Sequence, residues 1–223
     1  MYKPKTAIMC TGGLDSTILL YKESHLNPIP ITVNYGQVAF DKQVELLNHH
    51  IEVLNLPPLV ILEIPLFDWQ KKEGLFTQGY QPKEEKPLED WDKLRYEDFF
   101  VEGRNTIMVP YILAYCSAHG IVELLAGYLY GAEEWQNRRS YKLMTGDNSP
   151  QFVDTLNLVS QLGFSNQVRF RAPYYELKWD KKDIIKWAEE NDVDCSKTYS
   201  CYFIPACGVC DNCLLRKELK IDK

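Results

Sequence analysis

A chain of 223 residues with a formal net charge of -6 can build one α/β domain with a single core and a small appendage. Its composition, 45% hydrophobic and 25% charged, excludes a disordered chain, and no apolar run approaches the ~20 residues that span a bilayer. The acidic balance argues against a broad nucleic-acid surface, which usually carries a basic excess. Because no secretion signal precedes the first apolar run, we expect a cytoplasmic location.

Strand and helix patterns alternate along the chain. The predicted elements are, in order, a strand at 6–10, a helix at 14–23, a strand at 30–35, a helix at 41–54, a strand at 59–64, a helix at 105–119, a strand at 121–126, a helix at 149–162, a strand at 168–172 and a helix at 181–191. Residues 68–102 interrupt this alternation with charges, aromatics, Pro and Gly, so we interpret them as an irregular insertion or lid. The alternation predicts a parallel, Rossmann-like α/β sheet with helices on both faces and ligands at the carboxyl ends of its strands.

Two adjacent glycines follow the first predicted strand, in the run Cys10, Thr11, Gly12, Gly13, Leu14, Asp15, Ser16 and Thr17. Glycines let a backbone turn tightly and approach a ligand, and the amides of such a loop point at an anion. The carboxylate of Asp15 would repel a bare phosphate, but a bound Mg²⁺ would bridge the two. The loop therefore favours phosphate binding, and the alternative is a tight turn that only caps the helix.

This loop resembles the SGGxDS pyrophosphate loop of the N-type ATP pyrophosphatases, with Thr11 in place of the usual serine. That superfamily includes GMP synthetase, NAD synthetase, argininosuccinate synthetase and tRNA-thiolating enzymes. The resemblance implies an adenine nucleotide alpha hydrolase-like fold that uses ATP. It also implies adenylation, in which a substrate oxygen attacks the α-phosphorus of ATP and pyrophosphate leaves.

Four of the seven cysteines lie close together near the C-terminus, namely Cys201, Cys207, Cys210 and Cys213. Without a secretion signal, such clustering favours a metal over disulfides, and four thiolates complete a tetrahedral zinc site. A closed site of this kind is structural, so we expect a zinc-binding segment at 195–223 after an α/β domain at 1–194. Cys195 is an alternative ligand, while Cys10 and Cys116 are core candidates.

The glycine loop and the cysteine tail together resemble the 7-cyano-7-deazaguanine synthases (QueC-like proteins). Further matches run along nearly the whole chain. They are Asn34, Tyr35, Gly36 and Gln37; Gly103, Arg104 and Asn105; Arg171, Ala172 and Pro173, followed by residues 180–184; and residues 199–202 and 206–216. The resemblance implies that Asn34 to Gln37, Arg104, Asn105 and Gly127 form the nucleotide pocket together with the glycine loop.

The resemblance implies ATP-dependent conversion of 7-carboxy-7-deazaguanine. The carboxylate is adenylated, ammonia gives an amide, and a second adenylation with loss of water gives the nitrile. Asp15 would act through its magnesium ion, while Arg104 and Lys181 would stabilise charge on the reacting phosphorus or the departing pyrophosphate. The alternative for Arg104 and Lys181 is a solvated surface charge.

The substrate side departs from the family. After Gly127, a longer insertion at 130–145 stands where the family carries a G-Y-P-D-C-R segment. Asp147 and Asn148 are the substrate-binding candidates, since a carboxylate accepts hydrogen bonds from a guanine-like N–H edge. The alternative is that Asp147 only caps the next helix.

These changes leave the ATP-binding motifs intact. This is the pattern expected if the enzyme still activates its substrate with ATP but a different nucleophile attacks the activated substrate. An alternative function is therefore a divergent QueC-like ligase that joins the activated deazaguanine to a protein amine in anti-phage defence. A tRNA-thiolating or NAD-synthetase-like ligase and a non-catalytic, zinc-stabilised nucleotide-binding scaffold are further alternatives. The family also implies a homodimer, for which the helix at 107–115 is a candidate surface, and no direct nucleic-acid partner.

Overall fold

The computed structural model describes residues 5–66, 101, 103–130, 147–208 and 210–221. The predicted insertions at 68–102 and 130–145 therefore lie outside the described residues, apart from Val101 and Tyr130. No helix in the described ranges is long and apolar enough to cross a membrane. The homodimer expected from the family resemblance stays a prediction.

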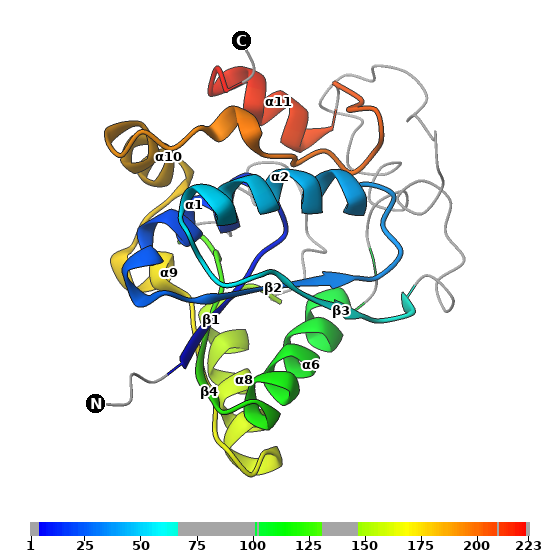
Figure 1. The fold of residues 1–223 in the computed structure, drawn as a ribbon, viewed down its shortest axis with the longest axis vertical. Helices are drawn as coiled ribbons and strands as arrows, with labels where there is room; N and C mark the ends of the chain where they lie inside the picture. Colours follow the sequence, from blue (N-terminus) through cyan, green and yellow to red (C-terminus); the bar gives the residue numbers. More distant parts are fainter. Residues whose placement is uncertain (1–4, 67–100, 102, 131–146, 209, 222–223) are drawn as a thin grey trace.

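One sheet of five parallel strands forms the centre of the molecule, in the order β3-β2-β1-β4-β5 (Figure 1). The strands are β1 (Lys5–Met9), β2 (Ile29–Asn34), β3 (Val60–Glu63), β4 (Ile121–Leu125) and β5 (Arg169–Arg171). Ala7 of β1 pairs with Ile29 of β2 on one side and with Leu124 of β4 on the other. The predicted parallel α/β sheet is confirmed.

Helices cover both faces of this sheet. Figure 1 shows α1 (Leu14–Lys22) and α2 (Phe40–Val53) on one face, and α6 (Arg104–Ala118) and α8 (Pro150–Gly163) on the other. Neighbouring residues of β1 pack on opposite faces of the sheet. Ile8 belongs to a hydrophobic core with Ile18 and Leu47, and Ala7 belongs to a second core with Ile112. The central strands β1 and β2 are buried on both faces and read as apolar runs, whereas the edge strand β3 alternates between half-buried and exposed residues.

Three further helices lie in the described C-terminal part of the chain: α9 (Pro173–Leu177), α10 (Lys181–Glu190) and α11 (Asp211–Glu218). Short 3-10 turns lie at Ser24–Leu26 and Cys195–Lys197. The helical pattern at 181–191 predicted α10, whereas α9, α11 and the turns were not predicted, because segments this short show no helical period. α10 begins at Lys181 because Asp180 and Asp183 form a reciprocal capping box.

The start of α8 decides one of the alternatives raised above. The Ser149 hydroxyl oxygen accepts a hydrogen bond from the Phe152 N–H at 3.2 Å, and Pro150 occupies the first turn. The interpretation of Asp147 as the cap of this helix is therefore wrong. Asp147 lies two residues before the cap.

The order of the strands creates a crevice at one edge of the sheet. The chain passes from β1 to β2 on one side, and later returns through α6 to β4 on the other side of β1. The connection after β1 leads to one side of the sheet, and the connection after β4 leads to the other side. Open α/β sheets bind ligands between two such strands, at the carboxyl ends of the strands. The Cys10–Thr17 loop follows β1 and Gly127 follows β4, so both border the crevice.

A buried histidine ties the C-terminal part of the chain to α2. His50 is fully buried, with its Nδ1 2.9 Å from the Tyr21 hydroxyl and its Nε2 2.9 Å from the Lys197 carbonyl oxygen. The neutral ring with the proton on Nε2 satisfies both contacts, since Nδ1 then accepts from Tyr21. Burial lowers the pKa of His50 below its ordinary value.

A histidine whose pKa is lowered by folding stabilises the fold fully only above its unfolded pKa of about 6.5. Protonation in the unfolded state removes that stability as the pH falls. We therefore expect the thermal midpoints of the wild type and a His50→Gln variant to converge as the pH falls from 8 to 5.5. The midpoint of the wild type should fall more than that of the variant. The exposed His25 provides the control, because His25→Gln should follow the wild-type profile. Parallel profiles for wild type and His50→Gln would contradict the prediction.

Candidate functional site

The loop from Cys10 to Thr17 is held from within by its own hydroxyls. The Thr11 N–H donates to Ser16 Oγ at 3.1 Å, the Ser16 hydroxyl donates to the Gly13 carbonyl at 3.3 Å, and Thr11 Oγ1 lies 3.2 Å from Ser16 Oγ. Cys10 is a core residue: its thiol donates to the Ile8 carbonyl at 3.5 Å, and burial raises its pKa to about 12. The loop therefore presents its backbone and hydroxyls, not a thiolate.

Two glycines permit close contacts around this loop. Gly12 has φ +68°, and a Cβ there would lie 2.5 Å from the Gln43 carbonyl oxygen of α2. A Cβ at Gly127 would lie 3.2 Å from the Asp15 carbonyl and 3.3 Å from the Ser16 nitrogen. Only residues without a side chain let α2 and the end of β4 approach the loop this closely.

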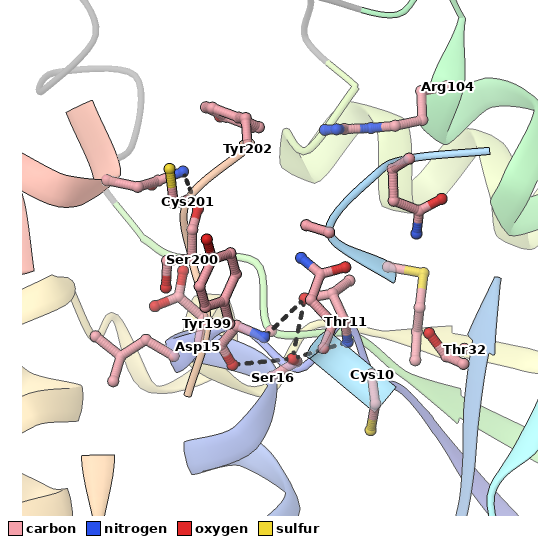
Figure 2. A pocket seen from close by; sticks show the side chains of 18 of the residues that line it. Cys10, Thr11, Asp15, Ser16, Thr32, Arg104, Tyr199, Ser200, Cys201 and Tyr202 are labelled. Carbon is pink, nitrogen blue, oxygen red and sulfur yellow. Dashed lines mark hydrogen bonds between the residues drawn. The ribbon is translucent and has the colours of Figure 1, made fainter. Parts of the chain in front are cut away.

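A cavity of about 340 Å³ opens in front of the loop. In Figure 2, Arg104 and Tyr202 lie across this space from Thr11 and Ser16. The predicted site residues that line the cavity are Cys10, Thr11, Gly13, Leu14, Asp15, Ser16, Tyr35, Gln37, Arg104, Asn105, Gly127, Asn148 and Lys181. Those that do not line it are Gly12, Thr17, Asn34, Gly36 and Asp147.

Asp15 and Lys181 form an ion pair at the edge of the cavity, although they lie 166 residues apart in the sequence. The capped start of α10 holds Lys181, and the Tyr174 hydroxyl of α9 donates to the Asp15 carbonyl at 3.1 Å. The side chain of Lys181 is only 23% exposed. The interpretation of Lys181 as a solvated surface charge is therefore wrong.

Arg104 begins α6 and lines the far side of the cavity. Burial works to lower the pKa of Arg104, but its interactions with Tyr35, Tyr202 and Asp147 outweigh this effect and raise the pKa. The guanidinium therefore stays charged. Lys181 and Arg104 thus supply positive charge on two sides of one cavity in a chain of net charge -6.

The turn after β2 presents Tyr35 to this cavity. Asn34 Oδ1 accepts the Gly36 N–H at 3.0 Å, Gln37 Oε1 accepts the Tyr35 N–H at 2.9 Å, and Gln37 Nε2 donates to the Val33 carbonyl at 3.1 Å. The two amide side chains are thus engaged with their own turn, which fixes Tyr35 where it hydrogen-bonds Arg104.

The four predicted cysteines form one cluster. Within the described part of the chain, it is the only group of three or more His, Cys, Asp or Glu side chains placed to hold a metal ion, and its ligand atoms all lie within 4.8 Å of one another. Cys201 Sγ lies 3.6 Å from Cys207 Sγ and 3.8 Å from Cys210 Sγ. Tetrahedral zinc with Zn–S bonds of about 2.3 Å requires sulfur separations of about 3.8 Å. The cluster fits zinc, and Cys195, the alternative ligand, is not part of it.

The cysteine segment also forms a wall of the cavity, through Tyr199, Ser200 and Cys201 (Figure 2). The Tyr199 N–H donates to the Gly12 carbonyl at 2.9 Å. Asn212 of α11 donates to the Ser200 carbonyl at 2.8 Å. The segment that would hold the metal is therefore hydrogen-bonded directly to the glycine loop.

The family described as queuosine biosynthesis protein QueC matches residues 5–220, a span that contains the glycine loop, the cavity and the cysteine cluster. The chain belongs to the QueC family.

Curated relatives of this QueC-family chain carry the name 7-cyano-7-deazaguanine synthase. One from Methanococcus maripaludis strain C5 is 28% identical over 228 residues, which cover 96% of this chain and 93% of the relative. One from Methanosphaera stadtmanae is 28% identical over 223 residues, covering 97% and 93%. A third, from Methanocaldococcus jannaschii, is 28% identical over 229 residues, covering 96% and 93%.

Several cavity residues of this QueC-family chain received no role from the sequence: Met9, Thr32, Met108, Tyr128, Tyr199, Tyr202 and Arg216. Tyr199, Tyr202 and Arg216 stood within motifs of the resemblance but were not assigned to the site. Tyr128 could have been predicted as a site residue from the sequence, because it follows the carboxyl end of β4, where ligands of parallel sheets bind.

Replacing Gly12 by Ala should destabilise the fold by about 1–3 kcal/mol, because the new Cβ meets the Gln43 carbonyl and the residue has φ +68°. Gly163 at the end of α8 is the matched control, since a Cβ there meets nothing within 4 Å. Gly163→Ala should leave the free energy of unfolding unchanged or raise it by about 0.5–1 kcal/mol. Urea unfolding measures both, and equal stability of the two variants would contradict the geometry.

Cys207→Ser should abolish binding of one zinc ion per chain, because it removes one of the four thiolates that would hold the metal. The thermal midpoint should fall, at about 2–4 °C per kcal/mol lost for a chain of this size. Cys195→Ser is the control that should keep the metal. Elemental analysis and thermal melts provide the measurements, and metal retained by Cys207→Ser together with metal lost by Cys195→Ser would reverse the assignment.

Proposed function

We propose that this chain is an ATP-dependent C–N ligase that activates 7-carboxy-7-deazaguanine and converts it to 7-cyano-7-deazaguanine. The observation that carries the proposal is the cavity in which the glycine loop, Lys181 and Arg104 meet at the carboxyl edge of a parallel sheet. Membership of the QueC family and relatives named 7-cyano-7-deazaguanine synthase support the choice of substrate.

The proposed activation step forms one bond and breaks another at phosphorus. A carboxylate oxygen of the substrate attacks the α-phosphorus of ATP, the bond to the β-phosphate oxygen breaks, and pyrophosphate leaves. Ammonia then attacks the acyl carbon and AMP leaves, which gives the amide. A second ATP adenylates the amide oxygen, and loss of AMP and of the two amide protons gives the nitrile.

The residues of the glycine loop would bind the polyphosphate of ATP. Hydrogen bonds between Thr11 and Ser16 hold the loop in one conformation, so little reorganisation is required when the anion arrives. Lys181 lies beside the loop and would stabilise charge on the departing pyrophosphate. Arg104 lies on the opposite side, where it would stabilise charge on the substrate or on the reacting phosphorus.

Asp15 would hold the Mg²⁺ that accompanies ATP. A single carboxylate suits Mg²⁺, because this ion is commonly held by one or two carboxylates plus phosphate oxygens and water. When bound, Mg²⁺ neutralises part of the polyphosphate charge. In the protein alone, Lys181 balances the charge of Asp15.

The zinc ion would be structural. Four thiolates leave no open coordination position for a substrate, and the segment contributes to the site by its backbone, through the Tyr199 N–H bonded to Gly12. We propose accordingly that residues 195–223 act as a zinc-binding segment that completes the α/β domain.

The acceptor distinguishes the proposal from its main alternative. The family's cysteine and arginine stand here as Asn148 and Ser149, and Ser149 is used to cap α8. With ammonium as the only amine, formation of the nitrile supports the synthase. An adenylated or amide product that never becomes the nitrile, but is transferred to an added protein amine, would instead support the ligase. The mass of the product decides.

Lys181→Met should lower pyrophosphate release by about 10²- to 10³-fold, as expected when a charge-stabilising group is removed from a reacting anion. The assay contains ATP, Mg²⁺, ammonium and 7-carboxy-7-deazaguanine. Lys182, the exposed neighbour, is the control, and Lys182→Met should react like wild type. Asp15→Asn should also lose turnover while its zinc content stays unchanged. Normal turnover by Lys181→Met would remove Lys181 from the proposed mechanism.

A further inference from the structure

The cavity wall contains a tyrosine without an assigned role. Tyr128 lines the cavity together with Arg104 and Asn148, and it interacts electrostatically with Arg104. Tyr128 follows Gly127 directly, so its backbone is anchored one residue from the contact between Gly127 and Asp15. Its ring packs edge-on against Phe170 of β5, with ring centroids 5.9 Å apart. The ring is therefore fixed by packing.

The hydroxyl of Tyr128 lacks a hydrogen-bond partner. Among the described residues, only two buried side-chain polar atoms are in this position, Tyr128 OH and Thr17 Oγ1. The large majority of buried side-chain polar atoms in proteins have a partner, so each exception requires an explanation. Thr17 does not line the cavity, whereas Tyr128, which is 8% exposed, does.

The groups around Tyr128 define what its hydroxyl can do. Burial raises the pKa of Tyr128 above its ordinary value, and the negative charge of Asp147 raises it further while Arg104 opposes this effect. The phenol is therefore protonated at neutral pH and can donate a hydrogen bond. Arg104 and Asp147 are half-buried, and side chains at binding sites commonly change rotamer when a ligand arrives.

We propose that Tyr128 is a specificity-determining residue, whose hydroxyl donates a hydrogen bond to an acceptor atom of a planar heteroaromatic carboxylate bound beside Arg104. This inference rests on the proposed function, because it takes the second ligand of the cavity to be the carboxylate that ATP activates. The phenol and the guanidinium together offer two donors to one anionic ligand, which favours a carboxylate over a neutral analogue.

A site that offers a buried donor discriminates against ligands that leave this donor unpaired. The carboxylate satisfies the hydroxyl that the protein leaves without a partner, whereas an analogue with a hydrogen atom in place of the carboxylate leaves it unsatisfied. Loss of one hydrogen bond to a charged group corresponds to about a 10- to 100-fold change in the dissociation constant.

The test uses Tyr128→Phe, which keeps the ring and removes only the hydroxyl. Calorimetric titration with 7-carboxy-7-deazaguanine, in the presence of a non-hydrolysable ATP analogue, should give a dissociation constant about 10- to 100-fold weaker than for the wild type. The dissociation constant of the ATP analogue should not change. The thermal midpoint of the free protein should be unchanged or higher, because an unsatisfied buried hydroxyl is removed.

Tyr21→Phe is the matched control. The Tyr21 hydroxyl contacts His50 at 2.9 Å, and Tyr21 does not line the cavity. This variant should melt at a lower temperature and bind the carboxylate like wild type. The two variants thus separate loss of a structural hydrogen bond from loss of a ligand contact.

Three results would overturn the inference in distinguishable ways. Equal binding of the carboxylate by wild type and Tyr128→Phe would remove the role of Tyr128 and leave the proposed function standing. A Tyr128→Phe protein that melts well below wild type would show that the hydroxyl has a partner within the protein. A wild type that binds the ATP analogue but not the carboxylate would remove the proposed substrate together with the role of Tyr128.

Discussion

The site depends on the close approach of three backbone segments to the glycine loop. The Gln43 carbonyl of α2 occupies the place of a Cβ at Gly12, the Gly127 backbone lies against Asp15, and the Tyr199 N–H donates to the Gly12 carbonyl. Each contact joins the loop to a different part of the chain. Because the contacts are made by main-chain atoms and glycines, no change of side chain elsewhere can restore them once a Cβ intervenes.

Electrostatics adds a second constraint on the same cavity. An acidic chain can offer positive charge to a ligand only where its cations are gathered locally, and here Arg104, Lys181 and Arg216 all line one cavity. Each is held by a partner: Lys181 by Asp15, Arg104 by Tyr35, and Arg216 by the Thr198 hydroxyl at 2.7 Å. These partners fix the directions of the charges before a ligand binds, which is how preorganised sites act on developing charge.

The alternating pattern of apolar strands and amphipathic helices was enough to predict the parallel sheet, and the spacing of the cysteines was enough to predict their cluster. Local sequence could not show that Lys181 reaches Asp15, since the pair is formed by the packing of α10 against α1. Nor could it reveal the unpartnered hydroxyl of Tyr128, because a missing partner is a property of the packed interior. The five-residue helix α9 was missed because it is too short to show a period.

The hydrogen bond between Tyr199 and Gly12 joins nearly opposite ends of the polypeptide. During synthesis, the glycine loop leaves the ribosome long before the segment that completes the cavity wall. A domain generally folds as a unit, so this contact can form only after residue 199 has emerged. The wall of the cavity formed by Tyr199, Ser200 and Cys201 is therefore among the last parts of the site to become available during synthesis.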